Sequence, residues 1–264
     1  MFAGDGDDDD GAGTTGQNIE GVVADDSDAQ NNAAQDSAAD DSSAQGSATS
    51  VAPATTTTVD LRAPSEGECP PEDGSAEVTA RFEQPPPLCI DLDTFYAAEM
   101  NTSLGTMEIV LDPTRDAASV NNFVFLARNR AYEGVLFHRV IEDFMVQGGD
   151  VEGLNGTGGP GYTFDGGSPQ AGQYRVGSLA MANQGSDPST NGAQFFIVTG
   201  PNGEALPPNF SLFGHVIDGI DVALEMHAVD TEVSDLPAVD IVIDSISITE
   251  ATPDQVEAYN EAIG

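Results

Sequence analysis

The first quarter of the sequence lacks the side chains that a folded core requires. From Met1 to Ser65 it consists mostly of Asp, Ala, Gly, Ser, Thr and Gln, and Phe2 is the only aromatic residue before Phe82. Such a segment buries too little apolar surface to offset a backbone entropy cost of roughly 1–2 kcal/mol per residue. We therefore predict that residues 1–68 are a disordered acidic linker rich in Ala, Ser, Thr and Asp, and that the fold is formed by the residues after it.

The charge of the chain excludes several classes of function. The sequence has 45 acidic residues and 7 basic residues, all of them arginine, which gives a formal net charge of −38. A nucleic-acid-binding protein needs a basic surface to displace counterions from phosphates, and an anionic membrane surface repels an acidic protein in the same way. Saline surroundings and a compositional bias are two explanations for the missing lysines. The excess of like charge favours a soluble monomer, and no apolar run approaches the roughly 18 residues that span a bilayer.

Residues 69–95 form a separate N-terminal extension that contains both cysteines. Cys69 and Cys89 are flanked by prolines, and a bridge between them would stabilise the fold by about 3 kcal/mol in the chain-entropy model. A metal site is a weaker alternative because no histidine or further cysteine lies nearby in the sequence. Two unrelated buried thiols are the remaining alternative. A disulfide is the prediction, and it would require an oxidising compartment.

The N-terminus leaves two localisations open. It has neither the positive segment nor the apolar segment of a secretory signal, yet a long Ser/Thr/Ala-rich linker typically separates a domain from a membrane. We expect an extracytoplasmic protein, either secreted or tethered through a hydrophobic segment that precedes this N-terminus. If Met1 is the true start, we expect a cytoplasmic protein.

Residues 96–250 have the hydropathy pattern of a β-rich domain. A helix is predicted over Asp116–Arg128, with Asp116 as its cap and apolar residues at helical spacing, and a second short helix near Asp221–Met226. The tail 251–264 is predicted to contain a short helix over Val256–Ile263. Many strands with two helices favour a barrel whose ends are covered by helices. Strands are predicted at 96–102, 107–111, 135–141, 144–148, 176–181, 194–199, 211–216 and 241–249.

Two sequence blocks carry the chemistry of the chain. The first runs from Phe137 to Asp150 (FHRVIEDFMVQGGD), and the second joins 177–183 (GSLAMAN) to 191–197 (NGAQFFI). These blocks resemble the cyclophilin family of peptidyl-prolyl cis–trans isomerases, and the resemblance covers about residues 96–250. It implies an eight-stranded antiparallel barrel capped by two helices, with the active site on the outer face. The cysteine- and proline-containing extension is similar to that of exported bacterial cyclophilins, particularly actinobacterial ones.

The resemblance also implies a role for individual residues. It makes Arg139 the catalytic residue and implies neither a cofactor nor a metal. The sequence departs from many eukaryotic members at Ala205, where they carry tryptophan, and at Phe210, where they carry histidine; Phe210 can still pack on a prolyl ring. The expected wall of the proline pocket is Phe144, Met145, Phe196 and Leu206, with Phe210 beside them, and the residues expected to hold the substrate backbone are Gln147, Ala182, Asn183 and Gln194.

The predicted function is isomerisation of X–Pro peptide bonds in proline-containing peptides and unfolded client proteins. Rotation breaks no bond, so the reaction needs a group that stabilises a twisted amide and no nucleophile or titrating base. A guanidinium supplies permanently charged donors for that purpose. The alternative is a non-catalytic proline-peptide binding module or chaperone on the same barrel. A metal-dependent hydrolase is disfavoured because His138, His215 and His227 lie far apart in the sequence.

Overall fold

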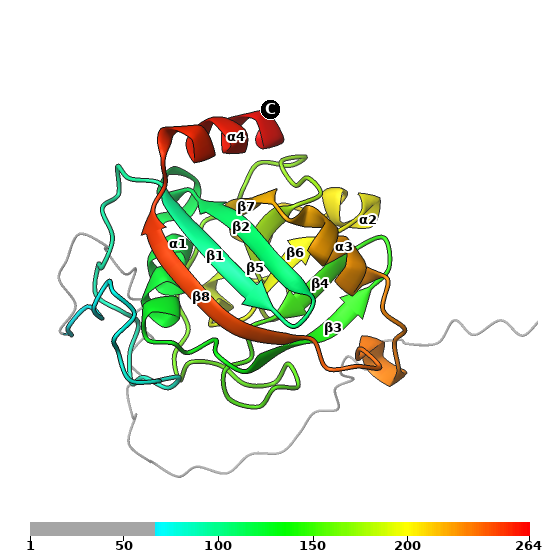
Figure 1. Ribbon diagram of the computed structural model, residues 1–264, viewed down its shortest axis with the longest axis horizontal. Coiled ribbons are helices and arrows are strands. Elements are labelled where there is room, and N and C mark those ends of the chain that lie inside the picture. The colour runs from blue at the N-terminus through cyan, green and yellow to red at the C-terminus, as the bar shows by residue number, and fades with distance from the viewer. Residues whose placement is uncertain (1–66) are drawn as a thin grey trace, which may run out of the picture. The chain divides into compact units, whose positions relative to one another are not determined.

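Eight short strands close into one antiparallel barrel in the computed structural model, which describes residues 67–264 (Figure 1). The order of hydrogen-bonded neighbours is β1-β2-β7-β5-β6-β4-β3-β8. The strands are β1 (Tyr96–Thr102), β2 (Gly105–Leu111), β3 (Val135–Ile141), β4 (Met145–Gly148), β5 (Ser178–Met181), β6 (Phe195–Val198), β7 (Leu212–Asp218) and β8 (Val242–Glu250). The predicted barrel and its strand positions are confirmed to within a few residues. The predicted disorder of residues 1–68 falls outside the described residues, except for 67 and 68.

Two helices pack their apolar faces against the barrel. Helix α1 (Pro113–Arg128) and helix α3 (Ile220–His227) place Phe123 and Met226, among others, in the same buried core as the inward-facing strand residues. The predicted helix began at Asp116, whereas α1 begins one turn earlier at Pro113, capped by Asp112. Asp116 still acts as a cap: its backbone is extended at φ −153°, and its side chain accepts hydrogen bonds from the next helical turn. The helix therefore has two capped starts, of which the sequence pattern showed one.

The C-terminal tail forms a longer helix than expected. Helix α4 (Pro253–Ile263) starts at a capping box in which Thr252 and Gln255 satisfy each other's backbone N–H groups. Tyr259 of α4 is buried, and its hydroxyl donates to Asp112 at 2.9 Å while accepting from Arg115 Nε at 2.7 Å. These two bonds fasten the tail to the start of α1. Helix α2 (Pro201–Glu204) and the 3₁₀ turns η1 (Pro188–Thr190) and η2 (Val233–Asp235) were not predicted.

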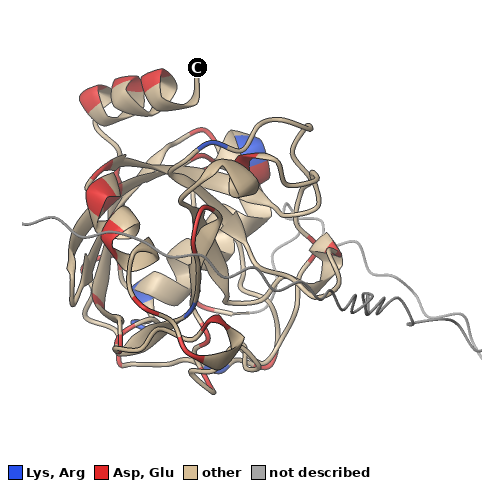
Figure 2. Ribbon diagram, turned by 90° about the vertical axis from the view of Figure 1, so that its right-hand side faces the viewer, with Lys and Arg blue, Asp and Glu red and all other residues tan. Residues whose placement is uncertain are grey.

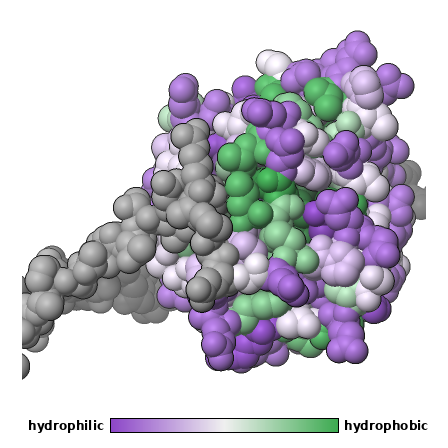
Figure 3. All heavy atoms as spheres, turned by 90° about the vertical axis from the view of Figure 1, so that its left-hand side faces the viewer, coloured by the Kyte–Doolittle hydropathy of each residue, from purple (hydrophilic) through white to green (hydrophobic). Residues whose placement is uncertain are grey.

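The N-terminal extension packs on α1 and on a long loop of the barrel. Cys69 and Cys89 are joined by a disulfide, with their Cα atoms 5.4 Å apart. Phe82 packs edge-on against Phe125 of α1 with ring centroids 4.8 Å apart, and its backbone N–H donates to the carbonyl of Pro160 at 2.7 Å. The extension is therefore in contact with the barrel both at a helix and at the loop 152–163. Figure 3 views the side of the molecule on which the extension lies in Figure 1 and shows apolar residues gathered at its centre within hydrophilic surroundings.

Acidic residues occur along much of the ribbon of the described part of the chain, with few arginines among them (Figure 2). Within residues 67–264, no helix has the length and apolar character needed to cross a membrane. The same part of the chain has no group of three or more His, Cys, Asp or Glu side chains that could hold a metal ion. The three histidines lie apart, in β3, in β7 and at the end of α3.

Candidate active site

A row of side chains crosses the outer face of the barrel. The strand register pairs Arg139 of β3 with Gln147 of β4, Gln147 with Phe196 of β6, and Phe196 with Ala180 of β5. Residues directly opposite each other in neighbouring strands present their side chains on the same face. A guanidinium, an amide and a phenyl ring are thus neighbours on one surface, although they are distant in the sequence.

A second apolar cluster explains why these strands are apolar on both faces. In β6, Phe195 and Ile197 belong to the barrel core, whereas the alternate residues Phe196 and Val198 belong to a cluster on the outside. Loops complete this outer cluster and leave a pocket of about 260 Å³. The pocket is lined by Arg139, Phe144, Met145, Gln147, Ala182, Asn183, Gly185, Ser186, Phe196, Leu206 and Phe210. Nine of the ten residues predicted for the site line this pocket, while Gln194 lies next to it.

Phe210 closes the apolar side of the pocket from a loop. Its ring lies edge-on to Phe196, with centroids 5.5 Å apart and an interplanar angle of 86°. Beneath it, the Tyr174 hydroxyl donates to the Phe210 carbonyl at 2.7 Å and accepts from the Phe210 N–H at 3.2 Å. Burial raises the pKa of Tyr174 to about 12, so the hydroxyl keeps its proton and both bonds persist at neutral pH. The position of Phe210 is therefore fixed by the hydrogen bonds between its backbone and Tyr174.

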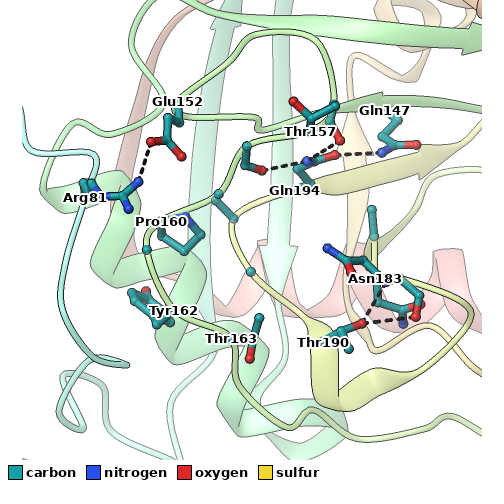
Figure 4. Close-up of a pocket in the computed structure, with 18 residues that line it drawn as sticks. Arg81, Gln147, Glu152, Thr157, Pro160, Tyr162, Thr163, Asn183, Thr190 and Gln194 are labelled. Atoms are coloured by element: carbon teal, nitrogen blue, oxygen red, sulfur yellow. Dashed lines mark hydrogen bonds and ion pairs between the residues drawn. The ribbon is translucent and has the colours of Figure 1, made fainter.

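On the polar side of the pocket, a chain of amides orients the guanidinium. Arg139 donates from a terminal nitrogen to Gln147 Oε1 at 3.5 Å, and Gln147 Nε2 donates to Gln194 Oε1 at 2.9 Å. Gln194 Nε2 then donates to the carbonyls of Gly156 and Gly158 at 3.0 and 2.9 Å (Figure 4). Because each amide oxygen accepts and each amide nitrogen donates, the orientation of both glutamines is fixed. Gln194 thus acts on the site through Gln147 and does not line the pocket.

The glycine pair that ends the first sequence block has a steric cause. Gly149 follows β4 with φ +86°, in the left-handed region that glycine adopts without strain. A Cβ at this position would lie 2.7 Å from the carbonyl oxygen of Ala193 and 3.1 Å from the Cα of Gln194. The close approach of these two chain segments is what brings Gln194 beside Gln147.

Asn183 has one polar atom left for a ligand. Its Nδ2 donates to the carbonyl of Asn209 at 2.8 Å, which fixes the side chain against the loop that carries Phe210. Its Oδ1 is buried and has no partner among the described residues. A buried acceptor without a partner costs free energy, so the arrangement favours a donor such as a peptide N–H arriving with a ligand.

A second pocket of about 680 Å³ adjoins the first and shares Gln147, Ala182 and Asn183 with it. Its far wall includes Arg81 of the N-terminal extension, which forms an ion pair with Glu152 (Figure 4). The four residues predicted to hold the substrate backbone, Gln147, Ala182, Asn183 and Gln194, all line this second pocket. Sequence reasoning gave no site role to Arg81 or to the glycine-rich segment, which was predicted as a long loop. No local signal connects Arg81 with that loop.

Comparison with known proteins decides the family. A family model described as "Cyclophilin type peptidyl-prolyl cis-trans isomerase/CLD" matches residues 97–248, more than half of the chain. The chain belongs to the cyclophilin family. The fold and the isomerase class predicted from the sequence are thereby confirmed.

Cyclophilins from several sources are similar to this chain over its barrel. Peptidyl-prolyl cis-trans isomerase B of Streptomyces anulatus is 40% identical over 170 residues, which cover 57% of this chain and 95% of that protein. Peptidyl-prolyl cis-trans isomerase A of Mycobacterium tuberculosis is 38% identical and shares 58% of this chain and 91% of its own length. The crystal structure of a cyclophilin-type isomerase of Cryptosporidium parvum superposes with a TM-score of 0.54 at 30% identity, covering 60% of this chain and 99% of that one.

Proposed function

We propose that the chain catalyses cis–trans rotation about X–Pro peptide bonds, with Arg139 as its catalytic residue. The observation that carries the proposal is that Arg139 lines the same small pocket as the aromatic residues Phe196 and Phe210. An apolar pocket of this kind suits the apolar prolyl ring. With the ring bound there, the X–Pro amide would lie next to the Arg139 guanidinium. Substrates are proline-containing peptides and unfolded client proteins, on which the chain acts as a monomer.

The reaction breaks no covalent bond, so the enzyme has only to lower the barrier to rotation about the X–Pro peptide bond. Resonance across the peptide bond opposes rotation by about 18–20 kcal/mol, so that uncatalysed X–Pro exchange takes roughly tens to hundreds of seconds. At the top of the barrier the amide is twisted, and the prolyl nitrogen regains a lone pair. A donor aimed at that nitrogen stabilises the twisted state selectively, since the planar ground state offers no free lone pair there.

Arg139 has donors available for this task. Its Nε donates to Asp235 Oδ2 at 3.2 Å, and one terminal nitrogen donates to Gln147, while the guanidinium as a whole has five N–H groups. The remaining donors can address the prolyl nitrogen and the neighbouring carbonyl. Arginine remains charged at every pH at which the protein is folded, so the step does not depend on a titrating group.

The two adjoining pockets bind different parts of the substrate. The smaller apolar pocket holds the prolyl ring, while Asn183 and the larger second pocket hold the flanking peptide, so that rotation is confined to one bond. A second structure of the Cryptosporidium parvum cyclophilin was determined in the presence of the dipeptide Ala-Pro; it superposes with a TM-score of 0.53 at 29% identity, covering 59% of this chain and 99% of that one. That relative supports a proline-containing ligand for this chain.

Exchange spectroscopy on a short proline peptide tests the proposal. We expect a catalytic amount of the protein, about one hundredth of the peptide concentration, to accelerate cis–trans exchange until exchange peaks appear, because the uncatalysed process is far slower than the measurement. The same peptide with an equal amount of an unrelated acidic protein is the control. Peptide binding without acceleration would contradict the proposal and support the non-catalytic binding module instead.

We also propose that the domain works in an oxidising compartment outside the cytoplasm. The support is the Cys69–Cys89 disulfide, which closes the segment of the extension that contains Arg81. Disulfides persist in such compartments and are reduced in most cytosols. In protein isolated from its host with thiols blocked at lysis, we expect no free thiol after denaturation. Two free thiols would contradict the proposal.

A further inference from the structure

The segment between α3 and β8 reaches the catalytic arginine from outside the sheet. Asp235 of this segment accepts a hydrogen bond from Arg139 Nε at 3.2 Å, whereas Gln147, on the neighbouring strand, accepts from a terminal nitrogen of the same guanidinium. Asp235 does not line the pocket, and its carboxylate has no other hydrogen bond or ion pair among the described residues. The guanidinium is thus held at two points by groups of different elements.

This segment is a closed loop with a defined shape. Backbone contacts join its two halves: an isolated bridge between Thr231 and Pro237, a bond of 2.7 Å from Glu232 N–H to the Leu236 carbonyl, and one of 2.8 Å from Ala238 N–H to the Asp230 carbonyl. At its tip, Ser234 and Asp235 both have left-handed backbones, with φ 67° and φ 62°. Two successive non-glycine residues in this region are unfavourable unless the surroundings fix them, and such strain is concentrated at functional sites.

We propose that Asp235 is a positioning residue that sets the plane of the Arg139 guanidinium. The inference rests on the proposed function, in which Arg139 donates to the prolyl nitrogen. A carboxylate on Nε occupies the inner edge of the guanidinium and leaves the outer donors to the substrate. Together with Gln147 it removes the rotation about the last bonds of the side chain, so the donors point toward the pocket before the substrate arrives.

The exposure of the pair separates positioning from stability. The side chains of Arg139 and Asp235 are 41% and 44% exposed. Exposed ion pairs contribute little to folding, so loss of the carboxylate is expected to leave the unfolding midpoint nearly unchanged. Its effect is expected on turnover instead, because a misdirected donor stabilises the twisted amide less while the apolar pocket still binds the ring.

The substitution Asp235→Ala tests this role. We expect kcat for a short proline peptide to fall about three- to tenfold with KM and the melting temperature nearly unchanged. Asp235→Asn keeps an oxygen acceptor for Nε, so it should restore most of the lost turnover. Glu232→Ala is the matched control, since it removes the same charge from the same loop at a side chain with no bond in the described structure; it should behave as wild type.

Four further outcomes are decisive. In the Arg139→Ala background, Asp235→Ala should cause no additional loss, because a positioning residue acts only through its partner. The Arg139 Nε–H resonance should exchange with water faster in Asp235→Ala than in the wild type. An unchanged or raised kcat in Asp235→Ala, alongside a large loss in Arg139→Ala, would overturn the inference and leave the proposed function standing. Full activity in Arg139→Ala would instead refute the proposed function.

Discussion

Arg139→Ala should lower kcat/KM for proline isomerisation by about 10²–10³-fold, mostly through kcat. Removal of a single preorganised donor from a site that stabilises developing charge has a cost of this order. Here the donor meets a lone pair that exists only in the twisted amide, so the loss falls on the transition state more than on the bound ground state. The measurement is the exchange assay described above, with enzyme concentration raised until catalysis by the variant is detectable.

The fold should survive that substitution. Arg139 is on the outer face of β3 and is 41% exposed, so its removal leaves no buried cavity and breaks one exposed ion pair. Arg130→Ala is a suitable control, because it also removes an arginine paired with a surface carboxylate, Glu133, and lies outside both pockets. Arg139→Lys should recover only part of the loss, since an ammonium lacks the planar fork. Wild-type turnover in Arg139→Ala would show that the guanidinium has no catalytic role.

The parts of the fold that follow from local pattern were predictable. The strand and turn pattern of residues 96–250 favoured a barrel covered by helices, and the structure has one. The pocket residues Phe196 and Met145 were placed by the resemblance of their sequence blocks to cyclophilins, because their strands are apolar on both faces and the hydropathy pattern does not show which face carries a site. The earlier start of α1, capped by Asp112, was not predicted. Asp112 and Asp116 are both suitable caps, and the kink between them has no hydropathy signal.

Long-range polar contacts were not predictable. Asp235 is 96 residues from Arg139, and it lies in a loop whose left-handed tip contains Ser and Asp where glycine would be expected. Arg81 is 71 residues from Glu152, and nothing in the composition of the extension indicates that it approaches the second pocket. Such contacts depend on where the closed barrel brings loop ends together, and on a surface this acidic many carboxylates are equally plausible partners.

Asp150→Ala should destabilise the protein by about 3 kcal/mol at pH 7. The Asp150 side chain is fully buried and accepts from backbone N–H groups of the loop that follows it. Truncation would leave five part-buried backbone donors without this partner, and a donor left unpaired away from water costs roughly 1–3 kcal/mol, less where water reaches it. The five donors are the N–H groups of Glu152, Gly153, Asn155, Gly156 and Gly158, at 2.8–3.1 Å.

The effect of Asp150→Ala should depend on pH in a defined direction. Burial alone would raise the pKa of Asp150, but the backbone N–H groups together outweigh it and lower the pKa to about 2 from its ordinary value of 3.8. A carboxyl whose pKa is lower in the folded state stabilises the fold above the unfolded value, and this contribution is lost as pH falls from 3.8 toward 2. The stability difference between wild type and variant should therefore narrow over that interval in urea unfolding experiments.

The same substitution should also weaken peptide binding through the amide chain. Gln194 is held by the carbonyls of Gly156 and Gly158, whose N–H groups Asp150 accepts, so a loosened loop releases Gln194 and then Gln147. We expect a several-fold rise in KM for a proline peptide. Asp150→Asn keeps one acceptor oxygen and should show a smaller change in both quantities, which provides a measurable variant if Asp150→Ala fails to fold.

Asp73→Ala separates the effect of losing the loop hydrogen bonds from the effect of losing one negative charge. Asp73 is an exposed carboxylate that accepts from one backbone N–H, that of Ser75 at 3.0 Å, so its removal changes the net charge equally but strands no buried donor. At pH 7 its unfolding midpoint should stay close to that of the wild type. If Asp150→Ala were as stable as Asp73→Ala, the loop would be held by its contacts with the extension, those of Pro160 with Phe82 and of Glu152 with Arg81, and the carboxylate would not be what shapes the polar side of the active site.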